Sequence, residues 1–280
     1  MNPYPPIRRS PIAGAWYPAN ADVLRSEING YIDAASDHAL AGEVTGLIAP
    51  HAGYFYSGAT AGHAYRCIGG NAYDVCVIFS PLHDYMPHRL LTSAHQAYAT
   101  PLGEVRVDQE LVEKCSASIE KETGEILQHI ANDREHSLEI QLPFLQVALT
   151  APFSLVPIMV RSQEPDLLES SAAAIAPLLK GYKVLLVAST DLSHFYDESE
   201  AIQLDNSMLQ QITAFSPDGV LKAERCGEGF ACGAGAVAFM LWTAKLLGAN
   251  RVTLLHHTTS ADASGDSSRV VGYGALAITH

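Results

Sequence analysis

Three histidines follow apolar, β-branched segments that have the character of buried strands. His51, His83 and His194 each come within a few residues of the end of such a segment. Ligands of open α/β sheets bind outside the carboxyl ends of the strands, so the three side chains converge if these segments are parallel neighbours. One histidine after a strand is usually an ordinary loop residue. Three in the same topological position predict a site for a metal or for proton transfer.

Two further side chains could complete this site. Asp191 follows the same segment as His194, where it could orient an imidazole, bind a metal, or cap the next helix. If a helix begins there, Asp191 and His194 share one of its faces. Cys232 lies among small residues just before a long helical pattern. The helix dipole would lower the pKa of its thiol and favour a metal ligand or a nucleophile, and the alternative is a small buried residue.

The polar segment 132–139 also carries groups that could do chemistry. Asn132 and Glu135 have the spacing of a capping box, so we expect a helix to begin there. His136 and Glu139 would then lie on one face of that helix, as a metal-binding or acid/base pair. A solvated helix face is the alternative explanation of the same spacing.

The rest of the pattern predicts the elements that position these groups. Nearly continuous apolar segments predict strands at 44–49, 75–80, 154–160, 184–189, 252–255 and 270–278. Helical patterns occur at 21–34, 58–67, 108–121, 136–149, 164–179, 199–215 and 231–247. The alternation predicts an α/β fold with a central mixed, largely parallel sheet flanked by helices. No linker or repeat divides the chain, so we expect one domain over 1–280, with 260–268 as a surface loop.

Composition argues against several classes of function. The chain has 280 residues, 48% of them hydrophobic, and a net charge of −13, without the basic stripe that nucleic acid binding requires. We find no secretory signal and no apolar run of the ~18–20 residues that a membrane span needs. The five cysteines form no CxxC pair and predict reduced thiols, so a cytoplasmic location is expected. Motifs for dinucleotides, nucleoside triphosphates and serine hydrolases are missing from the sequence.

Short motifs along nearly the whole chain resemble those of the Memo family in type and order. They are GAWYP at 14–18, APHAGY at 49–54, SPLH at 80–83, EHSLE at 135–139, STDLSH at 189–194, CG at 232–233 and YGAL at 273–276. Prokaryotic members are called AmmeMemoRadiSam system protein B. That name implies a radical-SAM protein and an AMMECR-type protein as partners.

The resemblance implies a fold similar to that of the class III extradiol dioxygenases, which hold non-haem Fe(II) through two histidines and a glutamate. By that resemblance, His51 and His83 are metal ligands and Cys232 takes the place of the glutamate. His194 is then the acid/base histidine, with Asp191 beside it. A thiolate in place of the carboxylate makes the site softer than the two-histidine, one-carboxylate pattern. The resemblance makes Fe(II) the first expectation for the cofactor, and the thiolate adds copper or zinc as alternatives. Because of the same thiolate, aromatic ring cleavage does not follow from the resemblance.

Three functions are compatible with these residues. The first is a metal-binding, dioxygenase-like protein with a redox role, in which a histidine transfers protons. The second is a non-catalytic adaptor that binds a peptide or a small molecule on the same fold. Its possible pocket residues are His136, Glu139, Trp16 and Tyr54. The third is metal-free thiol chemistry at Cys232, which requires a lowered thiol pKa.

Overall fold

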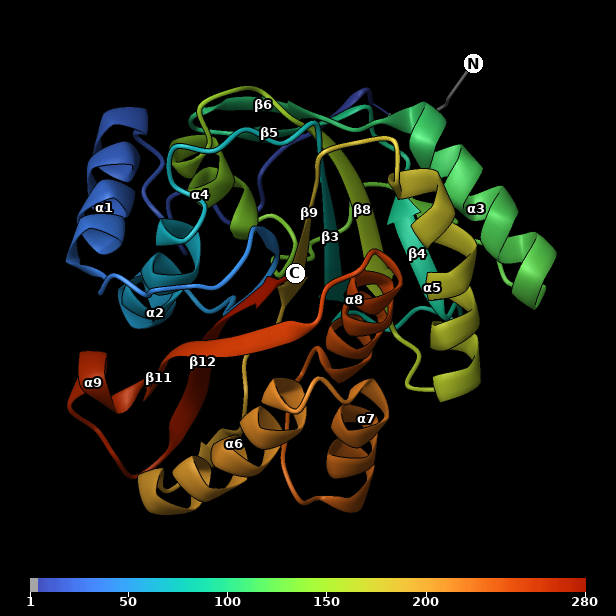
Figure 1. The fold of residues 1–280 in the computed structure, drawn as a ribbon. Coiled ribbons are helices and arrows are strands. Elements are labelled where there is room, and N and C mark those ends of the chain that lie inside the picture. The colour runs from blue at the N-terminus through green and yellow to red at the C-terminus, as the bar shows by residue number, and fades with distance from the viewer. Residues whose placement is uncertain (1–4) are drawn as a thin grey trace.

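The computed structural model describes residues 5–280, in which a nine-stranded mixed sheet lies between helices (Figure 1). The strand order is β10-β12-β2-β9-β3-β8-β4-β7, and β11 pairs with β12 outside this path. These strands are β2 (Val44–Ala49), β3 (Val75–Pro81), β4 (Leu90–Ser93), β7 (Gln128–Ile130), β8 (Ser154–Val160), β9 (Val184–Ser189), β10 (His194–Tyr196), β11 (Arg251–Thr259) and β12 (Val270–Thr279). A second sheet is made of β1 (Ile7–Arg8), β5 (Ala97–Thr100) and β6 (Gly103–Arg106). The predicted α/β fold with a mixed central sheet is confirmed.

The centre of the large sheet is parallel. β2 pairs with β9, β9 with β3, and β3 with β8, all in parallel register. Every residue of β3 is buried, as expected for a strand covered on both faces. On one side the sheet continues with antiparallel strands, β12 against β2 and then β10 and β11 against β12. The carboxyl ends of β2, β9 and β3 therefore meet at one edge of the sheet.

Helices cover both faces of this sheet (Figure 1). They are α1 (Ala21–Ala34), α2 (Tyr54–Arg66), α3 (Gln109–Thr123), α4 (Gln141–Ala148), α5 (Pro165–Leu179), α6 (Glu198–Thr213), α7 (Pro217–Cys226), α8 (Ala234–Leu246) and α9 (Ala261–Ser264). α1, α2 and α4 pack together, with α2 against β2 and β12, whereas α8 packs against β2, β3, β8 and β9 beside α5 and α7. None of the helices in the described part of the chain has the length and apolar character of a membrane span.

Each segment predicted as a strand is found as one, and 44–49, 154–160 and 184–189 match residue for residue. The pattern does not predict β1, β4, β5, β6, β7 or β10, since strands of two to four residues carry too little periodicity. It also misses α7. The prediction of a loop over 260–268 was incomplete, because α9 forms a short helix inside this segment.

The helix expected from the capping box at 132–135 does not form. Asn132 has a φ of 57°, in the left-handed region, whereas a helix N-cap has an extended backbone. The Glu135 carboxylate instead accepts hydrogen bonds from the backbone N–H groups of His83 and Ser137, at 2.6 and 2.8 Å. Helix α4 starts only at Gln141. The carboxylate is thus used to join two segments rather than to start a helix.

A group of histidines away from the sheet edge makes a testable contribution to stability. The rings of His63 and His256 stack at 4.2 Å between centroids, and Nε2 of His38 lies 3.5 Å from Nδ1 of His63. Burial, followed by the charges of His256 and His38, lowers the pKa of His63 from 6.5 to about 4. The folded chain therefore binds fewer protons than the unfolded chain between these values, and the free energy of unfolding rises with pH across this window.

Replacing His63 with glutamine is expected to make this pH dependence shallower between pH 4 and 6.5, because its contribution is lost while that of His136, whose pKa is also lowered to about 4, remains. Urea unfolding at several pH values across the window measures the slope. His88→Gln, at an exposed histidine, is the matched control and should keep the wild-type slope. An unchanged slope in His63→Gln contradicts the assignment.

Candidate functional site

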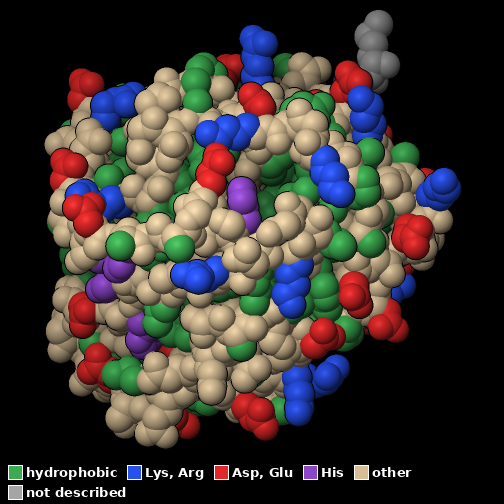
Figure 2. Space-filling view, viewed as in Figure 1, with side chains coloured by type: hydrophobic (Ala, Val, Ile, Leu, Met, Phe, Trp, Pro, Cys, Tyr) green, Lys and Arg blue, Asp and Glu red, His purple; other side chains and the backbone are tan. Residues whose placement is uncertain are grey.

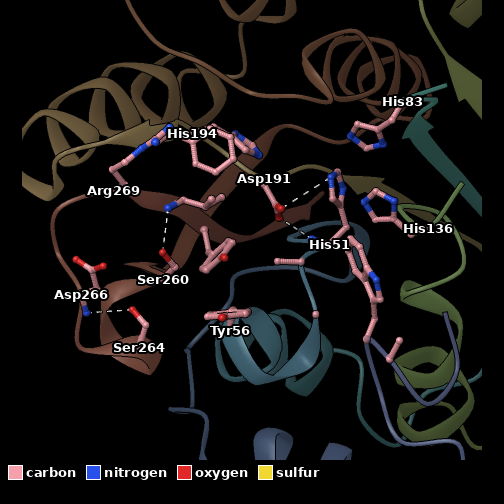
Figure 3. A pocket seen from close by; sticks show the side chains of 17 residues that line it. His51, Tyr56, His83, His136, Asp191, His194, Ser260, Ser264, Asp266 and Arg269 are labelled. Carbon is pink, nitrogen blue, oxygen red and sulfur yellow. Dashed lines mark hydrogen bonds and ion pairs between the residues drawn. The ribbon is translucent and has the colours of Figure 1, made fainter. Parts of the chain in front are cut away.

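The histidines that follow β2 and β3 lie together at the sheet edge (Figure 3). The rings of His51 and His83 are 5.3 Å apart between centroids and nearly perpendicular, at 84°. His136 lies 5.4 Å from His51 and stacks on His83 at 4.7 Å with an angle of 15°. Nitrogen atoms of the three imidazoles lie within 4.8 Å of one another, so the cluster could hold a metal ion.

The tautomer of His51 follows from its hydrogen bonds. Its Nδ1 lies 3.1 Å from the hydroxyl oxygen of Ser189. Ser189 donates its own proton to the carbonyl oxygen of Ser137, at 2.6 Å, so it can only accept from the imidazole. Nδ1 of His51 therefore carries the proton, and Nε2 presents a lone pair. Burial lowers the pKa of His51 to about 3, which keeps the ring neutral at physiological pH.

A carboxylate fixes His83 in the same way, by engaging its Nδ1 and leaving Nε2 free. Nδ1 of His83 lies 2.9 Å from Oε1 of Glu135, and this hydrogen bond raises the pKa of the imidazole. Burial alone would raise the pKa of Glu135, but the hydrogen bonds from His83 hold it well below its usual range. The arrangement leaves Nε2 of His83 for a ligand, as in carboxylate–histidine–metal triads.

Replacing Glu135 with glutamine is expected to weaken metal binding by about 10–100-fold without changing the number of ions bound. The reason is that the neutral amide no longer fixes the tautomer and orientation of His83. Competition with a chromophoric chelator measures the affinity. Glu125→Gln, at a surface ion pair with Arg89, is the control. An affinity equal to that of the control removes this role from Glu135.

Cys232 lies against the same cluster. Its Sγ is 3.2 Å from Nε2 of His51 and accepts a hydrogen bond from the backbone N–H of Asp191 at 3.3 Å. The residue comes two positions before α8, so the expected location near a helix start is correct. The expected fall in its pKa is wrong, because burial raises the pKa of the thiol well above its ordinary value. This finding opposes metal-free thiolate chemistry.

Gly233 permits this close approach of α8 to the strand ends. A Cβ atom at Gly233 would lie 2.5 Å from the carbonyl oxygen of Ser189, closer than real contacts allow. Its backbone N–H also donates to the hydroxyl of Thr190, at 2.9 Å. A glycine is therefore required for Cys232 to reach the histidines.

Asp191 supports the cluster through the backbone. Its Oδ1 accepts a hydrogen bond of 2.7 Å from the backbone N–H of His51, and Oδ2 lies 3.9 Å from Nε2 of the same residue. Burial raises the pKa of Asp191 to about 6. The helix after β9 is capped by Asp197 instead, and the chain reaches β10 first, so Asp191 and His194 do not share a helix face.

The remaining predicted pocket residues separate into two groups. Trp16 and His136 line one cavity, with their rings 4.2 Å apart. Glu139 and Tyr54 are not among the residues that line it. Glu139 forms a buried ion pair of 2.5 Å with Arg8, and the hydroxyl of Tyr54 donates to a backbone carbonyl. The residues before α4 form turns instead of a helix, so His136 and Glu139 point to different places.

The cavity has a volume of about 680 Å³ and extends well beyond the histidine cluster. His194 lines it, with Nδ1 donating to the carbonyl oxygen of Leu192 at 2.8 Å, which leaves Nε2 as the acceptor. Phe195, Ser260 and Arg269 also line it, and sequence reasoning missed all three. Phe195 directly follows a predicted site residue, which is the one signal that could have pointed to it.

Comparisons with known proteins agree on one family. The family model described as Memo-like protein matches residues 8–277. A MEMO1 family protein of Nitrosopumilus maritimus is 34% identical over 280 residues, covering 96% of this chain and 98% of the relative. One from Methanosarcina mazei is 31% identical over 274 residues, covering 97% and 99%. One from Sulfolobus acidocaldarius is 36% identical over 231 residues, covering 81% and 80%.

Proposed function

The chain belongs to the Memo family, and we propose that it binds a transition metal through His51, His83 and Cys232. Fe(II) is the first choice of metal, with copper or zinc as alternatives. The observation that carries the proposal is the 3.2 Å contact between Nε2 of His51 and Sγ of Cys232. It places a nitrogen and a sulfur donor together, beside a second imidazole whose Nδ1 is held by a carboxylate.

The donor distances fit a metal ion. Two ligands of a tetrahedral ion, with nitrogen at about 2.05 Å and sulfur at about 2.3 Å, lie about 3.6 Å apart. The distance of 3.2 Å is close to this value. Nitrogen atoms of His51, His83 and His136 lie within 4.8 Å of one another, and two nitrogen ligands of one ion lie ~3.4 Å apart, so metal binding requires His51 and His83 to move closer together.

Ring orientation favours Cys232 over His136 as the third ligand. The lone pair of an imidazole lies in the plane of its ring, so perpendicular rings can point at one ion. His51 and His83 meet this condition at 84°. His136 meets it toward His51, at 81°, but stacks on His83 at 15°, where the in-plane lone pairs run parallel, and it packs on Trp16 as well. We therefore assign His136 to the wall of the cavity.

A redox role is the second part of the proposal, and the residues around the ligands support it. When bound, iron or copper supplies one-electron chemistry that protein side chains lack. His194 lines the same cavity with Nε2 as an acceptor, and it transfers a proton to or from the bound substrate. Asp191 holds the backbone of His51 and acts as a positioning residue.

Anaerobic reconstitution tests the proposal. Protein without an affinity tag is incubated with Fe(II), Cu(I) or Zn(II), desalted, and its metal content measured; we expect about one ion per chain. Dioxygen uptake by the iron form that is lost in His194→Gln, with metal content unchanged, is the result expected for the redox role. Background metal content with all three ions rejects metal binding.

Exposed aromatic side chains favour a second candidate function, a binding module without turnover. Tyr56 and Phe195 line the cavity and are 45% and 62% exposed, and the neighbouring Phe55 is 67% exposed. Such surfaces are typical of sites that bind a peptide or a small molecule. A metal-loaded protein that binds ligands but takes up no dioxygen is the result expected for this candidate.

A further inference from the structure

The cavity is larger than a metal and its water ligands require. A water molecule fills about 30 Å³, and pockets for small organic molecules range over about 300–1,000 Å³. The volume of about 680 Å³ lies within that range. Figure 3 shows His51, His83 and His136 on one side and Ser260, Asp266 and Arg269 on the other. The side away from the histidines therefore has room and polar groups of its own.

Phe195 is held over this part of the cavity by an irregular strand. β10 pairs with β12 through His194 and Tyr196, and the register shifts between them, so Phe195 is the extra residue of a bulge. Its φ of 67° lies in the left-handed region, which is strained for an aromatic residue. The side chain is nevertheless 62% exposed. A bulge that aims an apolar ring at a cavity is typical of a binding site.

Arg269 lies next to this ring. Its guanidinium carbon is 5.4 Å from the ring centroid of Phe195. It is the one Lys or Arg among the residues that line the cavity, and no carboxylate forms an ion pair with it within residues 5–280. The nearby Asp266 accepts hydrogen bonds from Ser268, through both its backbone N–H and its hydroxyl, so it is engaged within its own turn.

We propose that Arg269 and Phe195 bind a small organic monocarboxylate with a planar, apolar body. The guanidinium binds the carboxylate in a bidentate manner, and the body packs on the ring of Phe195. This inference assigns a class of ligand to the cavity beside the proposed metal site. It rests on the proposed function in one respect only, namely that the end of the ligand away from the carboxylate lies toward the histidines.

Charge favours a monoanion. The chain carries a net charge of −13, and Figure 2 shows Lys and Arg side chains interspersed with Asp and Glu over the face in view. Arg269 is the one Lys or Arg among the lining residues, which also include Asp191 and Asp266, so it offers a local attraction without a wider positive field. A single carboxylate matches this one cation, whereas a dianionic phosphate ester would keep an uncompensated charge.

The test uses metal-free protein and a matched set of probes. Binding of benzoate, benzamide and phenyl phosphate is measured by calorimetry or ligand-observed NMR. We expect benzoate to bind more tightly than the neutral amide and the phosphate ester. Arg269→Gln should weaken benzoate binding about tenfold or more, since a charge-assisted hydrogen bond is lost. Arg251→Gln, at the far end of β11 with the same charge change, should bind like wild type.

Phe195→Gly separates binding from stability. Glycine adopts a positive φ without strain, so this variant should have an unchanged or higher urea midpoint. Its benzoate affinity should nevertheless fall, because the ring is missing. A fall in both quantities would make Phe195 a structural residue and remove it from the proposal.

Several outcomes overturn the proposal outright. They are equal binding of benzoate and benzamide, equal effects of Arg269→Gln and Arg251→Gln, tighter binding of phenyl phosphate, and no binding of any probe. Benzoate that binds only to metal-loaded protein, and equally to Arg269→Gln, would place the carboxylate on the metal. Failure of metal reconstitution with normal benzoate binding rejects the proposed metal site alone, so the two failures are distinguishable.

Discussion

Replacing both His51 and His83 with alanine is expected to lower the bound metal from about one ion per chain to background. Two of the three proposed ligands are then missing, and a lone cysteine does not retain an ion through desalting. Metal analysis after anaerobic reconstitution measures the loss. The single His136→Gln variant should keep its metal, because His136 stacks on His83 and forms part of the wall.

The control for this prediction is a histidine pair elsewhere on the chain. His38 and His63 also lie close together, with nitrogens 3.5 Å apart. The double alanine variant at His38 and His63 should retain about one ion per chain, since neither residue belongs to the histidine cluster at the ends of β2 and β3. Equal losses in the two double variants would show that the sheet-edge cluster has no special role.

Arg8→Ala is expected to lower the free energy of unfolding by about 3–5 kcal/mol, because it leaves buried carboxylate charge without its cation. Arg8 is only 3% exposed and contacts Glu139 at 2.5 Å and Asp133 at 2.8 Å. It also donates to the carbonyl oxygen of Glu135, the residue that orients His83. Urea unfolding monitored by circular dichroism measures the change.

Arg9→Ala provides the matched control, since Arg9 is the exposed neighbour of Arg8. It should cost less than about 0.5 kcal/mol, as surface substitutions do. The triple variant Arg8→Met, Asp133→Asn, Glu139→Gln should recover much of the stability, because all three charges of the buried ion pairs are removed together. Equal losses of unfolding free energy in Arg8→Ala and Arg9→Ala would contradict a stabilising role of the buried ion pair.

The strand ends were predictable because buried parallel strands leave a strong signal. The segments that form β2, β3 and β9 are short, apolar and β-branched, and a histidine follows each of them within a few residues. Their order in the sheet is a long-range property, but the rule that ligands meet at carboxyl ends needs only that they be parallel neighbours. That condition holds, so His51 and His83 meet as expected.

Side-chain roles that depend on distant partners were not predictable. The pair of His136 and Glu139 was assigned to one helix face from spacing alone. Glu139 instead forms an ion pair with Arg8, 131 residues away, and Glu135 accepts a hydrogen bond from His83. The lowered pKa expected for Cys232 failed for a related reason, since burial outweighs the effect of the nearby helix start. The bulge at Phe195 likewise depends on pairing with β12.

X-ray absorption spectroscopy of the zinc-loaded protein tests whether Cys232 binds the metal. We expect one sulfur ligand at about 2.3 Å together with nitrogen ligands at about 2.0–2.1 Å. In Cys232→Ser the sulfur shell should disappear, and in His136→Gln it should persist unchanged. A wild-type spectrum with nitrogen and oxygen ligands alone would contradict ligation by Cys232 and assign the metal to the three histidines.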